Sequence, residues 1–452
     1  MRLRKTITTI VATAILLAGW QLFAVIANQP ELIPSLPRLV RTLCEWLVSG
    51  SFYQSVGATI LRGILGMSIS FVCAIGMAGL FARFEWVYEL FRPLLAIMRS
   101  IPVISFILLA LIFLNPESIP LMIAFLTMFP LLTENLTRGI LDLRPGLSIM
   151  ARQFHIKRSN VLFQIIYPLL KPFLYSGLAS AAGFGWRAII MGEVLSQCAF
   201  GIGSEMKRAQ NFIAVPELLA WTIVAVFISF FFDKGISKVA DITPKISFAN
   251  EDQTIPTPTL SVLDTKDISY QYGIQHFSHS FQKGIIYGIN APSGKGKTTL
   301  LNLIGDILLP TEGEIHPTRH FGIATIFQQP QLLPHLTAEE NIILPLSSFL
   351  TEEKARRIAQ KHLQEMEMEP FGNRYPKELS YGQQQRIAIA RALAYPSPLL
   401  LMDEPFKGLD EALSHRIIER IREMQMKEER IILFTSHNPD EIRLLADEVI
   451  YL

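Results

Sequence analysis

The stretch Ala291-Pro-Ser-Gly-Lys-Gly-Lys-Thr-Thr299 decides how the C-terminal half of this chain folds. It follows an apolar segment from Gly284 to Ile289, which predicts a strand, and its glycine-rich turn opens a helix at Thr298. In such a loop the backbone N–H groups and the helix N-terminus face phosphate groups. We expect Lys297 to reach the outer phosphates of a nucleotide and the Thr298 hydroxyl to take a coordination position on Mg²⁺. For this stretch alone, an ordinary glycine turn is the alternative.

The loop departs at one position from the pattern GxxxxGK[ST]. Ala291 stands where the first glycine is expected, and a methyl group is tolerated there if the backbone keeps a negative φ angle. The loop residues expected to contact the nucleotide are Pro292, Ser293, Gly294, Lys295, Gly296, Lys297, Thr298 and Thr299.

A second apolar segment ends in two adjacent carboxylates. Residues 399–405 read Leu-Leu-Leu-Met-Asp-Glu-Pro, which predicts a buried strand followed by Asp403 and Glu404. We expect Asp403 to hold Mg²⁺ through water, and Glu404 to orient or deprotonate the water molecule that attacks the phosphate. A strand that merely ends in acidic residues is the alternative.

Between these two segments lies Leu379-Ser-Tyr-Gly-Gln-Gln-Gln-Arg386, which resembles the LSGGQ signature of ABC transporters with Tyr381 in place of its first glycine. The resemblance implies that Ser380, Gly382 and Gln383 contact nucleotide at the N-terminus of the helix that follows. A serine helix cap alone would explain Ser380, but it would not explain the Gln-Gln-Arg run.

Further positions extend the resemblance to an ABC ATPase over roughly residues 260–452. Gln328 matches the Q-loop glutamine that senses Mg²⁺ and the membrane domain, and His437 matches the histidine that contacts the γ-phosphate. Asp410 matches the D-loop aspartate at the dimer interface. Tyr272 fits an aromatic side chain that stacks on adenine, with Tyr270 as its rival and a core role as a further alternative.

The family resemblance therefore implies ATP and Mg²⁺ as cofactors. The residues implied at the metal are Thr298, Gln328 and Asp403, and those implied in catalysis are Lys297, Glu404 and His437.

The first half of the chain differs in character. Half of the 452 residues are hydrophobic, and the chain is long enough for two or three domains. Long apolar runs in the first 235 residues predict about six membrane helices. These runs lie at residues 6–28, 56–82, 94–114, 118–133, 173–197 and 213–232. We therefore expect an all-α polytopic membrane domain at 1–235, a linker at 236–258 and an α/β P-loop ATPase domain at 259–452.

Charge and cysteine content bear on partners and topology. Lys and Arg residues gather before the first apolar run and after the second and fourth, so both termini are expected on the cytoplasmic side. Residues 1–28 lack a small-residue cleavage site and are expected to be a signal anchor. No further domain is expected after the His437 segment. The net charge of +2 is uninformative about partners, and because there is no basic stripe a nucleic-acid partner is not expected. The three cysteines show no metal or disulfide spacing.

The loop expected between the fourth and fifth membrane helices resembles the EAA coupling loop of bacterial importer permeases. It reads Leu147-Ser-Ile-Met-Ala-Arg-Gln-Phe-His-Ile-Lys-Arg158 and continues to Pro168. Ile149 and His155 replace the glutamate and the glycine of that motif. We therefore expect the loop to contact the ATPase near Gln328 through apolar packing by Ile149, Phe154 and Ile156. An amphipathic loop helix without a partner is the alternative.

Three shorter stretches resemble the permeases of nitrate, sulfonate and taurine importers: Arg99-Ser-Ile-Pro-Val-Ile-Ser, Met128-Phe-Pro-Leu-Leu and Gly201-Ile-Gly-Ser. Arg187 and Glu193 lie within the fifth apolar run, where a role in the transport pathway, at a subunit interface or in a buried helix contact is open.

Together the resemblances imply a type I ABC importer half-transporter in the bacterial cytoplasmic membrane. It would work as a homodimer, because in this family each ATP lies between the phosphate loop of one subunit and the signature of the other. A periplasmic or lipid-anchored binding protein would deliver a small solute such as nitrate, a sulfonate, taurine, bicarbonate or a pyrimidine-type vitamin precursor.

Two other classes of protein remain as alternatives. An exporter is disfavoured by the short cytoplasmic loops and the coupling-loop resemblance. A poorly hydrolysing membrane scaffold is disfavoured by the intact Lys297, Asp403, Glu404 and His437, whereas Ala291 and Tyr381 favour it.

Overall fold

The computed structural model describes residues 2–143, 145–240, 244–253, 260–271, 273–292, 294–317 and 322–452. The chain forms two compact units, Met1–Asp142 with Leu169–Ile242 and Leu143–Pro168 with Thr243–Leu452. The segment that resembles a coupling loop therefore belongs to the same unit as the predicted ATPase, although helices of the first unit flank it in the sequence.

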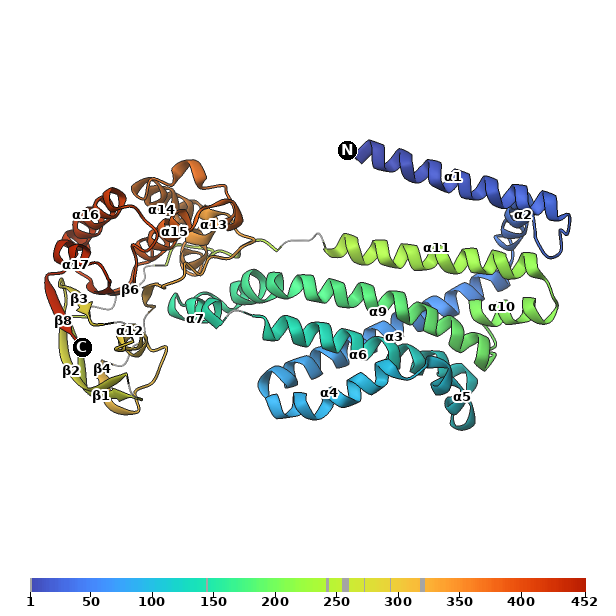
Figure 1. Cartoon of the computed structure of the whole chain (residues 1–452), viewed down its shortest axis with the longest axis horizontal. Helices are drawn as coiled ribbons and strands as arrows, with labels where there is room; N and C mark the ends of the chain where they lie inside the picture. The colour runs from blue at the N-terminus through green and yellow to red at the C-terminus, as the bar shows by residue number, and fades with distance from the viewer. Residues whose placement is uncertain are drawn as a thin grey trace. The chain divides into compact units, whose positions relative to one another are not determined.

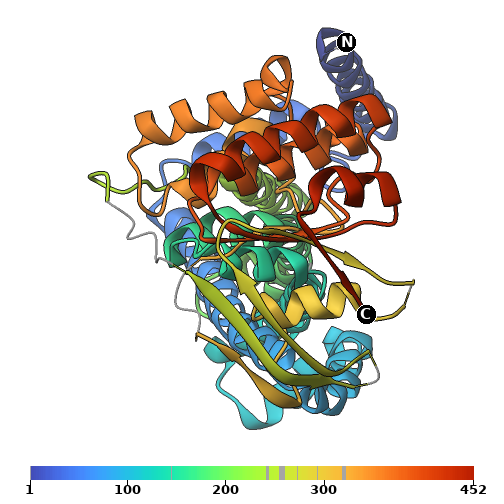
Figure 2. The same ribbon diagram turned by 90° about the vertical axis from the view of Figure 1, so that its left-hand side faces the viewer.

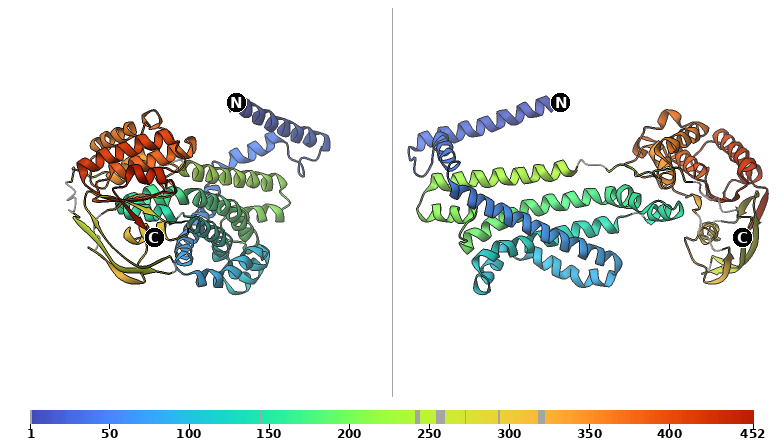
Figure 3. Two further views of the ribbon diagram at one scale, coloured as in Figure 1. Left: turned by 60° about the vertical axis from the view of Figure 1, so that its left-hand side comes forward. Right: turned by 180° about the vertical axis from the view of Figure 1, so that it is seen from behind.

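The described regular elements of the first unit are all helical, as predicted. The long helices α3, α6, α9 and α11 run alongside one another in the views of Figures 1 and 3. The elements are α1 (Arg2–Ala27), α2 (Leu36–Trp46), α3 (Gly50–Arg83), α4 (Glu85–Ser100), α5 (Val103–Phe113), η1 (Pro116–Ser118), α6 (Ile119–Leu141), α9 (Tyr167–Ser196), α10 (Ile202–Asn211) and α11 (Val215–Ala240).

The structure identifies four or five candidate membrane spans among the described residues, where the sequence predicts about six. Among the described residues, four helices are long and apolar enough to cross a membrane: Gly50–Arg83, Pro116–Leu141, Arg158–Ser196 and Val215–Ile236. The run expected at 94–114 is not one straight helix, because α4 and α5 meet at 94°. Pro102 lies at this break, and proline disfavours helical geometry in the residue before it. Counting the bent pair gives up to five spans, and α1 adds only a shorter apolar helix, Val11–Ala27.

Small residues allow close packing between helices of the first unit. A methyl group on Gly66 of α3 would lie 2.6 Å from Cβ of Ala124 in α6, and one on Gly185 of α9 would overlap Met128 of α6. Such close approach is typical of helices that pack within a membrane. α3, α6 and α9 therefore share one buried cluster.

Glu193, whose role the sequence left open, is fully buried in α9. Its carboxylate accepts hydrogen bonds from the Thr59 hydroxyl at 2.9 Å, from Arg62 at 2.7 Å and from the Gly203 N–H at 2.9 Å. Arg62 also pairs with Glu117 at 2.5 Å. The buried charge is therefore balanced by a cation and by hydrogen bonds, as a buried carboxylate requires.

The same contacts complete the N-terminus of α10. This helix begins at Ile202 without a side-chain cap from its own N-cap residue. The Ile202 N–H donates to Thr59 at 2.9 Å and the Gly203 N–H donates to Glu193, so two other helices satisfy its first N–H groups. A structural role thus accounts for Glu193, whereas Arg187 is exposed.

The second unit contains the predicted α/β fold. A five-stranded parallel sheet has the order β5-β6-β7-β3-β8, and a three-stranded antiparallel sheet has the order β2-β1-β4. The strands are β1 (Val262–Tyr270), β2 (Ile274–Gln282), β3 (Ile286–Asn290), β4 (Glu312–His316), β5 (Ala324–Ile326), β6 (Leu399–Asp403), β7 (Ile431–Thr435) and β8 (Glu448–Tyr451). β6 and β7 are buried along their whole length, which is typical of parallel strands covered on both faces.

The helices of this unit include α12 (Lys297–Ile304), α13 (Ala338–Leu346), α14 (Glu352–Glu365), α15 (Tyr381–Ala394), α16 (Glu411–Glu428) and α17 (Pro439–Leu445), with short turns η3 (Glu369–Phe371) and η4 (Pro376–Glu378). α12, α15 and α17 contact strands of the parallel sheet, and α13 and α14 pack against α15. The coupling-loop segment adds α7 (Pro145–Gln153), α8 (Arg158–Asn160) and the π-helical turn η2 (Val161–Ile166).

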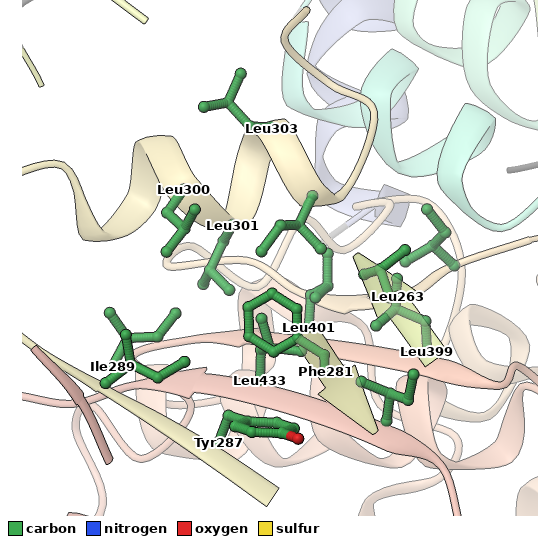
Figure 4. Packing of buried hydrophobic residues seen from close by; sticks show 14 of the residues in the cluster. Leu263, Phe281, Tyr287, Ile289, Leu300, Leu301, Leu303, Leu399, Leu401 and Leu433 are labelled. Carbon is green, nitrogen blue, oxygen red and sulfur yellow. The ribbon is translucent and has the colours of Figure 1, made fainter. Parts of the chain in front are cut away.

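α12 joins the two sheets through the core. In Figure 2 this yellow helix lies between the β1–β2 hairpin and the parallel sheet. Figure 4 shows Leu301 of α12 directed towards Phe281 of β2 and Leu401 of β6, and all three side chains belong to one buried cluster. Core packing therefore holds α12 in place, and with it Lys297 and Thr298 at its start.

The predicted linker begins within a helix, because α11 continues to Ala240. Its described part beyond that, residues 244–253, has no regular structure but is held by hydrogen bonds within the second unit. The Ala249 N–H donates to Ser347 O at 3.1 Å, and the Gln253 N–H donates to Phe349 O at 2.8 Å.

Candidate functional site

Polar side chains gather where the central parallel strands end. The residues that follow β3, β6 and β7 lie at the same edge of the sheet, because parallel strands present their carboxyl ends together. Lys297 and Thr298 follow β3, Asp403 and Glu404 end β6, and His437 follows β7. This arrangement places all five predicted residues near one another.

The loop between β3 and α12 has the backbone geometry of a phosphate cradle. Gly294 and Gly296 have φ angles of +81° and +91°, which only glycine adopts readily. A methyl group on Gly296 would also lie 2.6 Å from Gly273 O. Ala291 does not have a positive φ, so its methyl group is accommodated as predicted. Ser293, and Tyr272 with its predicted adenine contact, lie outside the described residues.

Lys297 and Thr298 contact groups that the sequence predicted beside them. The buried Lys297 ammonium donates to Ala291 O at 2.8 Å and to Nδ1 of His437 at 3.1 Å. The Thr298 hydroxyl donates to the Asp403 carboxylate at 3.0 Å. Asp403 also accepts from the Thr435 hydroxyl at 2.8 Å. The lysine expected to bind phosphate and the two oxygen ligands expected for Mg²⁺ are thus brought together.

Glu404 lies at the centre of a second set of contacts. Its carboxylate lies 3.0 Å from Nε2 of His437 and accepts a hydrogen bond from the Gln328 side chain at 3.3 Å. Lys407 pairs with it at 3.4 Å. Glu404 has a φ of +48°, and a non-glycine residue in this region commonly marks a functional site. Gln328, Glu404 and His437, which are far apart in sequence, therefore lie in contact in the structure.

The two carboxylates differ in electrostatic environment. Burial raises the pKa of Asp403, and this effect outweighs the hydrogen bonds from Thr435 and Thr298 that oppose it. Burial alone would also raise the pKa of Glu404, but the hydrogen bonds from Gln328 and Lys407 outweigh it, so the pKa of Glu404 is lowered. Glu404 is therefore ionised at neutral pH, as a group that accepts a proton from water must be.

The residues present fit Mg²⁺ and a nucleotide phosphate. α12 has no acidic residue in its first turn, and its N-cap is Gly296, which has no side chain that could cap the first N–H groups. The helix start thus keeps its positive dipole end for an anion. Thr298 and Asp403 present the hydroxyl and carboxylate oxygens that Mg²⁺ prefers, with the Gln328 side chain nearby.

The signature and D-loop residues lie on helix starts. Ser380 caps α15 in a capping box with Gln383, since its hydroxyl accepts from the Gln383 N–H at 3.3 Å and its N–H donates to the Gln383 side chain at 2.9 Å. Asp410 caps α16 by accepting from the Leu413 N–H at 2.9 Å. Both residues thus have a local structural role beside the predicted contact with nucleotide.

Sequence reasoning missed a contact of Tyr381. Its hydroxyl donates to Gln328 O at 2.8 Å, so the residue that departs from the signature contacts the Q-loop of its own chain. Nothing in the sequence pattern indicates this pair, because the residues are 53 positions apart and lie on different elements.

The coupling-loop segment is buried within the second unit. The ring of Phe154 is fully buried and packs edge-to-face on Tyr395, with ring centroids 5.1 Å apart. Ile156 is buried as well. The prediction for Ile149 is corrected, because this side chain is only half-buried and Leu147 and Met150 on the other face of α7 are buried in its place. The spacing of 147, 150, 151 and 154 follows a helix face, which would have indicated this set.

Polar contacts, which we did not predict, also hold this segment. The buried side chain of Gln153 donates to Gly305 O and accepts from the Thr325 hydroxyl at 3.2 Å, while its backbone O accepts from the Ile323 N–H at 2.8 Å. Asn160 donates to the Ser347 hydroxyl at 2.8 Å. Burial of a glutamine depends on the acceptors opposite it, which the local sequence does not reveal.

Arg391 of α15 links Phe154 to the Q-loop. Its guanidinium lies over the Phe154 ring, 5.4 Å from the centroid, and donates to Gln331 O at 2.8 Å and Pro330 O at 2.9 Å. Burial lowers the pKa of Arg391 to about 9, so the side chain is still cationic at neutral pH. The Q-loop and the coupling-loop segment thus share one buried cation.

Comparisons with known proteins agree with this division of the chain. Residues 56–233 match the family described as binding-protein-dependent transport system inner membrane component, and residues 274–407 match the family described as ABC transporter. An uncharacterized ABC transporter ATP-binding protein of Methanocaldococcus jannaschii is 34% identical over 201 residues, which cover 40% of this chain and 85% of that protein.

Two further relatives are matched over about half of their own length. An Fe(3+) ions import ATP-binding protein of Rhizobium etli is 35% identical over 189 residues, covering 40% of this chain and 54% of the relative. A carnitine transport ATP-binding protein of Listeria monocytogenes is 37% identical over 186 residues, covering 38% of this chain and 47% of the relative. The chain thus spans about half the length of these two relatives.

Among solved structures, a dimeric post-hydrolysis ATP-binding cassette bound to ADP and Pi is similar, with 32% identity and a TM-score of 0.40. The match covers 42% of this chain and 94% of the chain in the solved structure.

Proposed function

Because this chain belongs to the ABC transporter family, with a permease segment fused to an ATP-binding cassette, we propose that it is one half of an ATP-driven importer of a small solute. The observation that carries this proposal is the burial of the permease loop at 143–168 within the same compact unit as the ATPase fold. An importer requires such a contact, because ATP binding to the ATPase must change the arrangement of the membrane helices.

The polar network supplies each role that ATP hydrolysis needs. Lys297 is placed to neutralise charge on the outer phosphates, and Thr298 with Asp403 is placed to hold Mg²⁺. Glu404 orients the attacking water and accepts its proton, while His437, in contact with Lys297 and Glu404, lies where charge develops. Bound ATP with Mg²⁺ supplies the phosphoanhydride bond whose cleavage resets the transporter.

The working form in this proposal is a homodimer. In the family, ATP lies between the phosphate loop of one subunit and the signature of the other, and this chain carries one of each. Ser380, Gly382 and Gln383 would then act on nucleotide held by the partner's phosphate loop, and closure of the dimer would pull on the coupling loops.

The proposed setting is the bacterial cytoplasmic membrane, with both termini on the cytoplasmic side. A periplasmic or lipid-anchored binding protein would deliver the solute. The stretches at 99–105, 128–132 and 201–204 favour a nitrate, sulfonate or taurine-like solute or a vitamin precursor.

An uptake assay tests this function. Cells that express the chain should accumulate one of a panel of labelled solutes, namely nitrate, taurine, an alkanesulfonate, bicarbonate and a pyrimidine vitamin precursor. Cells that express Lys297→Ala should not. Faster loss of a preloaded solute in the wild type would instead indicate an exporter, and ATP binding without any solute movement would indicate a scaffold.

A further inference from the structure

Tyr381 connects three segments that surround the hydrolysis chemistry. Its hydroxyl donates to the backbone O of Gln328 in the Q-loop. Its ring lies against Gly408 in the loop after β6, where an added methyl group would lie 2.7 Å from the ring. Tyr381 itself begins α15, so one side chain bridges the signature helix, the Q-loop and the loop that carries Lys407.

The Q-loop is thereby held at both ends by the same helix. Arg391, near the end of α15, donates to Pro330 O and Gln331 O, and Tyr381, at its start, donates to Gln328 O. These contacts hold the backbone from which the Gln328 side chain extends. That side chain donates to Glu404 at 3.3 Å.

The contact of Tyr381 reaches Glu404 through one intermediate residue. Gln328 contacts Tyr381 through its backbone O and Glu404 through its side chain. A polar cavity lined by Gln328, Tyr381 and Lys407 lies beside this chain of contacts.

We propose that Tyr381 is a positioning residue that holds Gln328 within hydrogen-bonding distance of Glu404 and so supports ATP turnover. The proposal rests on the proposed hydrolysis of ATP by this site. It explains why a tyrosine replaces the first glycine of the signature, because tyrosine supplies a hydroxyl that glycine lacks. The ring has room because residue 408 is a glycine.

Removing only the hydroxyl tests the proposal. In the purified full-length chain, Tyr381→Phe should lower kcat for ATP hydrolysis about three- to tenfold, the scale of one neutral hydrogen bond, with little change in KM for ATP. Tyr451→Phe is the matched control, because Tyr451 is 76% exposed at the edge strand β8, and it should leave kcat unchanged. Thermal unfolding of both variants checks that the fold is intact.

A double-mutant cycle separates positioning from a general effect. If Tyr381 acts through Gln328, then Tyr381→Phe should cause no further loss in a Gln328→Ala background. Wild-type kcat in Tyr381→Phe, or an equal loss in both backgrounds, would overturn the proposal. A wild-type chain that binds ATP without hydrolysing it would instead contradict the proposed function itself.

Discussion

At the candidate site charged and polar side chains contact one another, whereas at the coupling contact the loop itself contributes the fully buried ring of Phe154, which has no polar atom. In the proposed function Lys297, Asp403 and Glu404 each have a chemical task that depends on the charge of the side chain. The coupling contact requires only a well-filled surface with a few satisfied hydrogen bonds. This difference explains why the coupling loop has diverged from its motif at Ile149 and His155 while the residues of hydrolysis match theirs.

The largest expected effect concerns the polar side of this comparison. Glu404→Gln keeps the shape of the side chain but removes the proton acceptor, so ATP turnover should fall by about 10²-fold or more. ATP binding should persist, because Lys297 and the loop at 291–296 are unchanged. Phosphate release and nucleotide binding, measured on the same preparation, provide the check. Turnover close to wild type would mean that Glu404 is not the base.

The next effect concerns the apolar side. Phe154→Ala removes a fully buried ring, and burial of such a side chain is worth about 1.5–3 kcal/mol, enough to shift a coupled equilibrium more than tenfold. Basal ATP hydrolysis should remain, and its stimulation by the loaded binding protein should be lost. Phe163→Ala is the matched control, because Phe163 lies in the same loop but is 49% exposed. Loss of stimulation in both variants, or in neither, would contradict a specific role of Phe154.

A smaller effect concerns a polar group within the coupling contact. It tests whether this contact depends on hydrogen bonds as well as on apolar packing. Gln153→Met keeps the length of the side chain but leaves Gly305 O and the Thr325 hydroxyl without this partner. The loss of buried hydrogen bonds predicts a reduction of about fivefold in stimulated turnover. Arg158→Met, an exposed change in the same loop, serves as the control. Unchanged stimulation in Gln153→Met would show that apolar packing alone makes the contact.

The smallest effect concerns the stability of the second unit, which contains both the candidate site and the coupling contact. Burial lowers the pKa of His362 below its ordinary value of 6.5. The unfolded chain therefore takes up a proton near pH 6.5, whereas the folded chain does so only at lower pH. Stability should thus be retained above this value and fall as the pH drops below it. Thermal unfolding across this range should show a weaker acid shift in His362→Gln, and an identical shift in both proteins would refute the assignment.

The residues of the nucleotide site could be predicted because each follows a recognisable strand or opens a helix. Parallel strands end at one edge of a sheet, so Lys297, Asp403 and His437 had to converge once β3, β6 and β7 were recognised. Tyr381 could not be placed in the same way. Its partner is a backbone oxygen on another element, and the direction of its side chain depends on Gly408.

The helices of the first unit were less predictable, because a hydropathy profile shows how apolar a segment is and not where its helix bends. The apolar run at 94–114 hides the 94° break between α4 and α5, although Pro102 marks the position. Glu193 looked like a costly charge in an apolar helix, and its cation, Arg62, lies 131 residues away. In the second unit, the half-buried Ile149 was predicted on residue type alone, whereas the buried residues Leu147 and Met150 follow helical spacing.

The central claim is that the ATPase holds the permease loop of its own chain, and a disulfide test addresses it directly. The Lys157 N–H donates to the Ser348 hydroxyl at 2.9 Å, so cysteines at these two positions should be close enough to bond. Lys157→Cys with Ser348→Cys is made in a chain whose three native cysteines, Cys44, Cys73 and Cys198, are replaced. Oxidation in membranes should yield a disulfide within one chain, seen as a monomer of altered mobility that reverts on reduction. A cross-linked dimer, or no cross-link under conditions that oxidise exposed thiols, would contradict the account.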